Sequence, residues 1–239
     1  MSSSPRAVFF DLDDTLLDGV GAMQAAWPLV LAPVSEQFGV DVDRLRESIR
    51  GESSEFWKDE AVVGHWRLDL EGARTICVEK AFSAEGVDPS LARQVAEHYR
   101  DAFREHSHLF PDAIATLEAI RASGLKTALL TNGAGGPQRD KIDRFELADY
   151  FDTIVIEGEF GRGKPSPDVF RHALDVVGAT PDQAWHIGDN LFADVCGAQS
   201  VGLHAAWIHR ERLQMREDPP AVPDRSVAHL DEITAALKL

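Results

Sequence analysis

"AVFFDLDDTLLDG", residues 7–19, places four acidic residues directly behind an apolar run. The run Ala7 to Phe10 is short and continuous, which is typical of a strand buried on both faces of a parallel sheet. Carboxylates gathered at the end of such a strand repel one another and resist removal from water. The stretch is therefore either a solvated acidic loop or a place where a cation binds, and the rest of the chain has to decide between the two.

The overall composition is that of an ordinary soluble globular protein, with 239 residues, 44% of them hydrophobic and 27% charged. The net charge of −16, from 40 acidic and 24 basic residues, disfavours general binding to nucleic acid or to an anionic membrane. A small anionic ligand would therefore need a local positive site or a bound cation.

The cysteines and the apolar segments indicate the compartment. Cys77 and Cys196 have no CxxC spacing and are expected to be buried thiols, as in a reducing cytoplasm. The first residues, MSSSPRAVFF, lack the features of a secretory signal. The apolar stretch 25–34 is about half a membrane span and contains two prolines. We expect a cytoplasmic protein without a membrane partner, as a monomer or a small homo-oligomer.

Short apolar runs alternate with segments of helical periodicity, a pattern that predicts an α/β fold with a doubly wound parallel sheet. The predicted strands are 7–10, 126–131, 153–158, 184–188 and 203–208, with 226–230 as a candidate edge strand. The predicted helices between them are 112–123, 137–145, 167–177 and 190–201. Residues 18–108 break the alternation, because they have helical patterns throughout and no convincing strand. They are predicted to form a helical insertion after the first strand.

Polar residues follow four of the predicted strands. Asp11-Leu12-Asp13-Asp14-Thr15 follows the first, Thr131-Asn132-Gly133 the second, Lys164-Pro165 lies beyond the third, and Gly188-Asp189-Asn190 follows the fourth, with Asp194 further on. In an open parallel sheet, ligands bind beyond the carboxyl ends of the strands, so these residues are expected to converge. A cation among the carboxylates then explains why they are gathered.

The residue types indicate phosphoryl chemistry. Mg²⁺ prefers about six oxygen ligands, and Asp11 and Asp189 are placed to supply two of them from different strands. A carboxylate can attack phosphorus, and a second one can protonate the leaving oxygen and then activate water. The charge on the transferred group needs donors and cations, which Thr131 and Lys164 could supply.

The four segments resemble, in order, the four motifs of the haloacid dehalogenase (HAD) superfamily, and in particular its phosphatase branch. They are DLDDT (11–15), LLTNG (129–133), GKPSPDVF (163–170) and IGDNLFAD (187–194). The resemblance implies a Rossmann-like core domain from residues 1–17 and 109–239. It implies a helical cap domain for residues 18–108, which match the family's cap in position and class only. We expect this cap to act as a mobile lid that selects the substrate.

The resemblance also implies roles for the first motif. Asp11 would be the nucleophile that forms an aspartyl-phosphate, and a Mg²⁺ ligand through its other oxygen. Asp13 would be the general acid and base, with its backbone carbonyl also on the metal.

The other motifs would bind the phosphoryl group and the metal. Thr131 and Asn132 would hold the phosphoryl group, and Lys164 would neutralise it and hold Asp11. Asp189 would be a metal ligand, and Asp194 would orient the groups around it. The chain is thus expected to be a Mg²⁺-dependent phosphatase acting on a small phosphorylated metabolite.

Three other functions are alternatives to a phosphatase. A phosphomutase of the same superfamily returns the phosphoryl group to another sugar hydroxyl, and the motifs barely separate it from a hydrolase. A dehalogenase or phosphonatase of the superfamily resembles this chain at the nucleophile but lacks an acid at the position of Asp13. A phospho-accepting signalling module uses similar residues, but it is much shorter, keeps its acceptor on a middle strand and has no helical cap.

Several other residues have simpler interpretations. Asp14 is expected to cap the turn or the next helix. The nine histidines show no zinc spacing and are assigned to core or surface. Trp57 and Trp66 are expected in the core of the insertion, and the mixed-charge stretch 66–74 is expected to be a solvated helix face.

Three basic residues of the insertion are candidates for substrate contacts: Arg50, Lys58 and Arg104. A solvated surface is the simpler expectation for each of them.

Overall fold

The computed structural model describes residues 5–58, 62–63, 66–210, 212 and 219–237. The chain divides into two compact units, one of Met1–Asp18 with Leu109–Leu239 and the other of Gly19–His108. Each unit is described by itself below. No helix among the described residues has the length and apolar character needed to cross a membrane.

The first unit contains a six-stranded sheet in the order β3-β2-β1-β4-β5-β6, and every pair of neighbours is parallel. The strands are β1 (Ala7–Phe10), β2 (Lys126–Thr131), β3 (Thr153–Ile156), β4 (Ala184–Gly188), β5 (His204–Ile208) and β6 (Arg225–Val227). The predicted α/β class with a doubly wound parallel sheet is confirmed.

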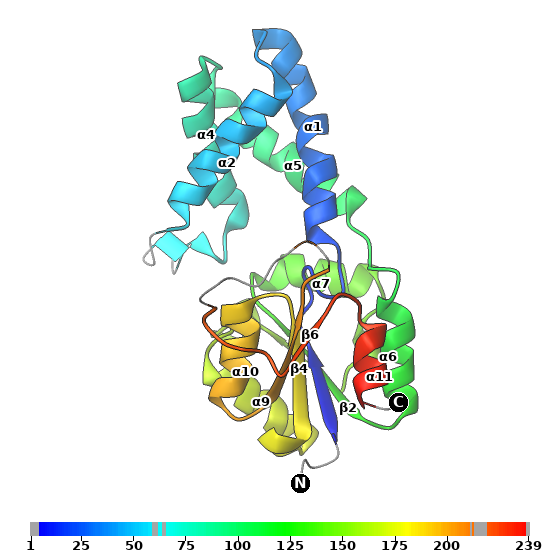
Figure 1. Cartoon of the computed structure of the whole chain (residues 1–239). Helices are drawn as coiled ribbons and strands as arrows, with labels where there is room; N and C mark the ends of the chain where they lie inside the picture. Colours follow the sequence, from blue (N-terminus) through cyan, green and yellow to red (C-terminus); the bar gives the residue numbers. More distant parts are fainter. Residues whose placement is uncertain (1–4, 59–61, 64–65, 211, 213–218, 238–239) are drawn as a thin grey trace. The chain divides into compact units, whose positions relative to one another are not determined.

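Strand β1 lies in the middle of the sheet, between β2 and β4 (Figure 1). Its four residues are all buried, and they alternate between two cores. Val8 and Phe10 belong to one hydrophobic cluster, whereas Ala7 and Phe9 belong to the other. Because both faces of the strand are buried, all of its residues are apolar and the sequence shows a continuous apolar run.

Helices cover both faces of the sheet (Figure 1). Residues of α6 (Ala113–Ala122) and α11 (Asp231–Leu237) pack in the cluster that contains Phe10. Residues of α9 (Pro167–Val177) and α10 (Gly197–Ser200) pack in the cluster that contains Phe9. The remaining helices of this unit are α7 (Gly135–Arg144) and the short α8 (Glu157–Phe160).

Three predicted elements differ from the structure. The candidate edge strand 226–230 is the shorter β6, Arg225–Val227. The third strand ends at Ile156, not at 158, because helix α8 begins at Glu157. The backbone N–H of Gly158 donates to Gly133 O at 2.9 Å, which turns the chain toward the end of β2. The predicted helix 190–201 is a π-helical segment, Leu191–Cys196, followed by α10.

The second unit is helical throughout its described residues, which agrees with the periodicity of the insertion. Its helices are α1 (Gly19–Phe38), α2 (Val42–Phe56), α4 (Leu70–Glu85) and α5 (Ala92–His106), with a 3₁₀ turn at Pro89–Leu91. Asp41 caps α2 by accepting from two backbone N–H groups, and Asp69 caps α4 by accepting from Gly72. Leu31, Leu45, Val78 and Phe82 belong to the hydrophobic core of this unit.

Both cysteines are free. Cys77 is buried in the helical unit, as expected, whereas Cys196 is only half-buried at the end of the π-helical segment.

Candidate active site

The strand ends bring the predicted site residues into one network of contacts. The register places Phe10 beside Leu129 of β2 and Ile187 of β4, so the three carboxyl ends lie next to one another. One residue further on, the N–H of Asp11 still donates to Ile187 O at 2.9 Å. The residues that follow these strands are therefore held at the same edge of the sheet.

Lys164 lies at the centre of this network. Its ammonium is 2.5 Å from Asp11 Oδ1 and 2.6 Å from Asp194 Oδ1, and the residue is only 3% exposed. Burial alone would lower the pKa of Lys164, but the two carboxylates outweigh burial and raise it. The lysine therefore carries its charge inside the protein, where ion pairs are screened least.

Asn132 fixes the backbone of Lys164. Its side-chain amide donates to Lys164 O at 2.8 Å and accepts from Lys164 N at 2.7 Å. The end of β2 thus positions a lysine that belongs to the segment after β3, and the two predicted motifs meet through the backbone.

An acidic cluster surrounds the lysine. Asp11, Asp189 and Asp194 each offer a carboxylate oxygen, and these atoms lie within 4.8 Å of one another. Burial, and next the charge of Asp11, raise the pKa of Asp189 to about 9. Burial also raises the pKa of Asp11 to about 7, in spite of Lys164. The single ammonium cannot compensate three ionised carboxylates, so a second cation would be needed for all three to be charged. Carboxylate oxygens are ligands that Mg²⁺ prefers. The donor set fits a magnesium ion.

Asp194 is the most firmly held of the three. It is 1% exposed, and it accepts from His186 Nε2 at 2.9 Å and from Asn190 N at 3.0 Å. Burial alone would raise the pKa of Asp194, but Lys164 and His186 together lower it. Its side chain fills the space beside Gly188, where an added Cβ would overlap the Asp194 carboxyl carbon. Only a glycine fits there.

Asp13 has partners that the sequence analysis missed. Its carboxylate is 2.7 Å from Lys141 Nζ and accepts from Gln138 Nε2 at 3.0 Å. Burial alone would raise the pKa of Asp13, but the Lys141 ammonium and these hydrogen bonds lower it. Gln138 also donates to Thr131 Oγ1 at 2.5 Å, which links the first motif to the second.

A helical spacing could have revealed these partners. Gln138 and Lys141 are three residues apart on α7, so they share a face of the helix that follows the Thr131-Asn132-Gly133 turn. His186 was assigned to core or surface, and it is in fact a buried core residue that also contacts Asp194. His186 lies two residues before Gly188 on β4, so the two residues face the same side of the sheet. This period of two would have indicated that His186 lies near the residues that contact Gly188.

Asp14 lies in the turn that follows these residues. Its φ is 59°, in the left-handed region that aspartate tolerates better than most residues, and its N–H donates to Leu17 O at 2.7 Å. This backbone geometry agrees with the expected turn role.

Known proteins of similar sequence are hydrolases. A family model for haloacid dehalogenase-like hydrolases matches residues 5–202. The chain is 35% identical to a phosphoserine phosphatase of Thermus thermophilus, over 97% of this chain and 98% of that protein. It is 29% identical to the N-acylneuraminate-9-phosphatase of Mus musculus, over 99% of this chain and 95% of that protein.

A solved structure has the same fold. The chain superposes with a TM-score of 0.79 on YfnB from Bacillus subtilis, described as a HAD-hydrolase bound to magnesium. That comparison covers 99% of this chain and 100% of that one at 19% identity, so it concerns the fold alone.

Proposed function

The chain belongs to the haloacid dehalogenase-like hydrolases, and on that premise we propose that it is a Mg²⁺-dependent phosphatase of a small phosphorylated metabolite. The observation that carries the proposal is the contact of Lys164 with Asp11 beside the carboxylates of Asp189 and Asp194. The curated relatives are named as phosphatases, which supports hydrolysis over transfer of the phosphoryl group to a second hydroxyl.

In the first step, a carboxylate oxygen of Asp11 attacks phosphorus, and the bond from phosphorus to the alcohol oxygen breaks. Asp13 gives its proton to that oxygen. In the second step, Asp13 takes a proton from water, the water oxygen attacks phosphorus, and the bond to Asp11 breaks to release phosphate. The Lys141 ammonium lowers the pKa of Asp13 despite its burial, so at neutral pH the carboxylate has to take up a proton from solvent before it can act as the acid.

The surrounding residues bind and orient the phosphoryl group. Lys164 would neutralise part of its charge while it holds Asp11, and Thr131 and Asn132 would lie against its oxygens. Asp11 and Asp189, with the backbone carbonyl of Asp13, would hold the metal, and Asp194 would keep Lys164 in place. When bound, Mg²⁺ would neutralise the clustered carboxylates and stabilise the negative charge of the phosphoryl oxygens.

The test is hydrolysis of nitrophenyl phosphate by the full chain. Asp11→Asn should lower kcat by at least about 10³-fold, since the amide is a poor nucleophile. Asp175→Asn is the matched control, because Asp175 is exposed on α9, and it should keep the wild-type rate. Circular dichroism shows whether each variant is folded.

Removal of the metal is the second arm of this test. EDTA should abolish activity, and Mg²⁺ should restore it better than Ca²⁺, whose larger coordination shell suits a six-oxygen site poorly. Wild-type turnover by Asp11→Asn, or full activity in the chelator, would overturn the proposal.

A further inference from the structure

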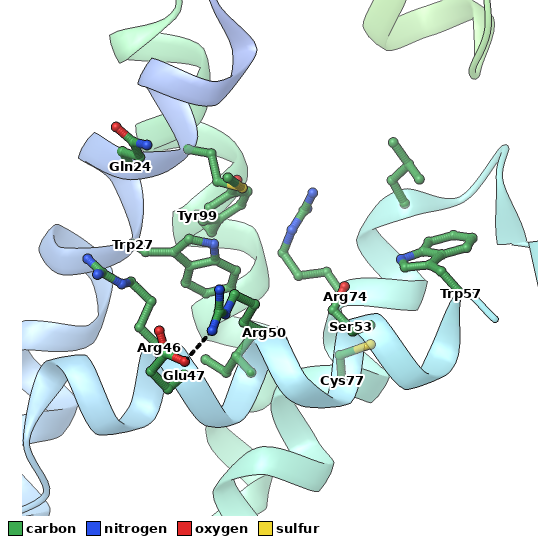
Figure 2. Close-up of a pocket in the computed structure, with 14 residues that line it drawn as sticks. Gln24, Trp27, Arg46, Glu47, Arg50, Ser53, Trp57, Arg74, Cys77 and Tyr99 are labelled. Carbon is green, nitrogen blue, oxygen red and sulfur yellow. Dashed lines mark hydrogen bonds and ion pairs between the residues drawn. The ribbon is translucent and has the colours of Figure 1, made fainter. Parts of the chain in front are cut away.

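The helical unit contains a cavity of about 600 Å³, and none of its lining residues is among the site residues described above. Figure 2 shows side chains of α1, α2, α4 and α5 around it. Its lining includes three aromatic residues and three arginines: Trp27, Trp57, Tyr99, Arg46, Arg50 and Arg74. A volume of this size suits a small metabolite.

Arg74 differs from the other two arginines in its partners. Arg50 is 2.6 Å from Glu47, and Arg46 is 3.3 Å from Asp43, so both are ion-paired. Among the residues that the structure describes, Arg74 has no ion pair or hydrogen bond. The charge of Glu71 acts on it, but the Glu71 carboxylate is ion-paired with Arg100 at 2.8 Å. The guanidinium carbon of Arg74 instead lies 4.3 Å from the centre of the Tyr99 ring. Burial lowers the pKa of Arg74, and the nearby Tyr99 and Glu71 offset this only in part.

The position of this guanidinium leaves it free to bind a ligand. One face is covered by the ring of Tyr99, so its N–H groups can donate in the plane toward the cavity. In Figure 2 the Arg74 side chain is drawn between Tyr99 and Trp57. Its planar fork of donors matches the two oxygens of a carboxylate.

The rest of the lining indicates what kind of molecule carries the anion. The ring centroids of Trp27 and Tyr99 lie 4.2 Å apart, with the ring planes tilted by 34°, and both residues line the cavity. Arg50 is paired with Glu47 inside the lining and Arg46 with Asp43 outside it, so Arg74 is the lining arginine that has no ion pair among the described residues. One such arginine favours one singly charged group over a dianionic phosphate.

We propose that this cavity binds a small molecule through a single carboxylate held by Arg74, with the carbon body of the molecule against Trp27 and Tyr99. The carboxylate has two conceivable sources, the phosphorylated substrate or a separate phosphate-free acid. The first source rests on the proposed function, and the second does not.

Direct binding comes first. Acetate, lactate, succinate and benzoate are titrated into the full chain, each beside its uncharged amide, and tryptophan fluorescence is recorded because Trp27 and Trp57 line the cavity. At least one acid should bind more tightly than its amide. Arg74→Gln should weaken that binding about 10- to 100-fold, the usual effect of losing a charged hydrogen bond. Arg74→Lys keeps the positive charge but loses the planar pair of donors, so its affinity for the acid should lie between those of wild type and Arg74→Gln.

Turnover shows whether the substrate supplies the carboxylate. The probes are two pairs that differ in the carboxylate, 3-phosphoglycerate with glycerol 3-phosphate and phosphoglycolate with ethyl phosphate. If the substrate supplies it, Arg74→Gln lowers the ratio of kcat/KM within a pair about 10- to 100-fold, mainly through KM. If a separate acid binds, that ratio is unchanged, and the acid alters wild-type hydrolysis of nitrophenyl phosphate in an Arg74-dependent way.

The matched control is Arg93→Gln, which removes an exposed arginine of the same unit that does not line the cavity. It should leave binding and turnover unchanged, and the melting temperature of each variant shows that it is folded. If Arg74→Gln matches wild type in both assays, the inference is wrong. If wild type fails to hydrolyse nitrophenyl phosphate at all, the proposed function is wrong, and the binding assay still decides the inference.

Discussion

Two lysines hold Asp11 and Asp13 of the first motif, and each does so from a different part of the chain. Lys164 contacts Asp11 from the segment after β3, whereas Lys141 contacts Asp13 from α7. In the proposed mechanism Asp13 has to carry a proton to the leaving oxygen. Lys141 therefore sets the pH range in which that proton is present.

This dependence on Lys141 can be measured in the pH–rate profile. In Lys141→Met the ammonium is gone, so burial raises the pKa of Asp13 and the protonated acid persists to higher pH. The alkaline limb of kcat/KM for an alkyl phosphate should move to higher pH. Lys141→Arg keeps the positive charge and should leave that limb where it is in wild type. An unchanged profile in Lys141→Met would show that Asp13 is not the titrating acid.

For individual residues, the sequence predicts the location of a site side chain when that residue lies at or just after the end of a predicted strand. Of the seven predicted site residues, Thr131 is the last residue of β2, Lys164 lies beyond α8, and the other five follow strands. The structure joins them through contacts with Lys164, Gln138 and one another. The stretch 66–74 is predicted to be a solvated helix face, and residues 68–70 are exposed, whereas Arg74 at its end is half-buried and lines a cavity. The place of Arg74 depends on how four helices pack, and a mixed-charge stretch carries no signal of that.

At the scale of elements, the beginnings of β2 and β3 are held together by one carboxylate. Asp152 precedes β3 and accepts from Lys126 Nζ at 2.6 Å and from Thr127 N at 2.8 Å. Burial alone would raise the pKa of Asp152, but Lys126 and the Thr127 N–H lower it. The carboxylate thus stabilises the folded state above its ordinary pKa of 3.8, and this contribution is lost as the pH falls through the lowered value.

The corresponding variant is Asp152→Asn. It should unfold about 2–4 °C below wild type at pH 7, for a loss of about 1 kcal/mol that is modest because the side chain is partly exposed. Well below the lowered pKa, where the wild-type carboxyl is protonated too, the difference should vanish. Asp175→Asn, on the exposed side of α9, should show no difference at either pH. A gap that persists in acid would mean that the carboxylate charge is not what stabilises this corner.

Strands were predicted correctly where the pattern of apolar residues within the strand itself is enough to identify it. The bounds of β1, β2 and β4 match the predicted strands, because two-sided burial produces an unbroken apolar run. The end of β3 and the π-helical segment 191–196 were not predicted. Both depend on contacts with distant residues: Gly158 with Gly133, and Asp194 with Lys164 and His186.

On the scale of the whole molecule, the chain leaves the sheet unit after Asp18, forms the helical unit, and returns at Leu109. The helical unit is continuous in sequence and has a hydrophobic core of its own. The sheet unit, in contrast, is assembled from two separate segments, and its central strand β1 comes from the first of them.

Because β1 lies between β2 and β4 in the sheet, it can pair on both sides only after both of these later strands have been synthesised on the ribosome. The strand is made first, but its neighbours are β2, which ends at Thr131, and β4, which ends at Gly188. Until synthesis has passed both, β1 is an apolar segment with an unpaired edge, a form of chain that tends to aggregate. The helical unit can fold in the meantime, since domains tend to fold as they emerge.

Nascent chains stalled at two lengths can reveal this order. With only the segment up to Arg144 outside the ribosome, a protease should spare 19–108 and cut near 7–18. Once the segment up to Ile208 has emerged, both 19–108 and 7–18 should resist the protease. Protection of 7–18 in the shorter chain would contradict this order. A chaperone that binds apolar segments should contact residues 7–10 only in the shorter chain, so the strand directly before Asp11, the proposed nucleophile, is also the one that waits longest for its partners.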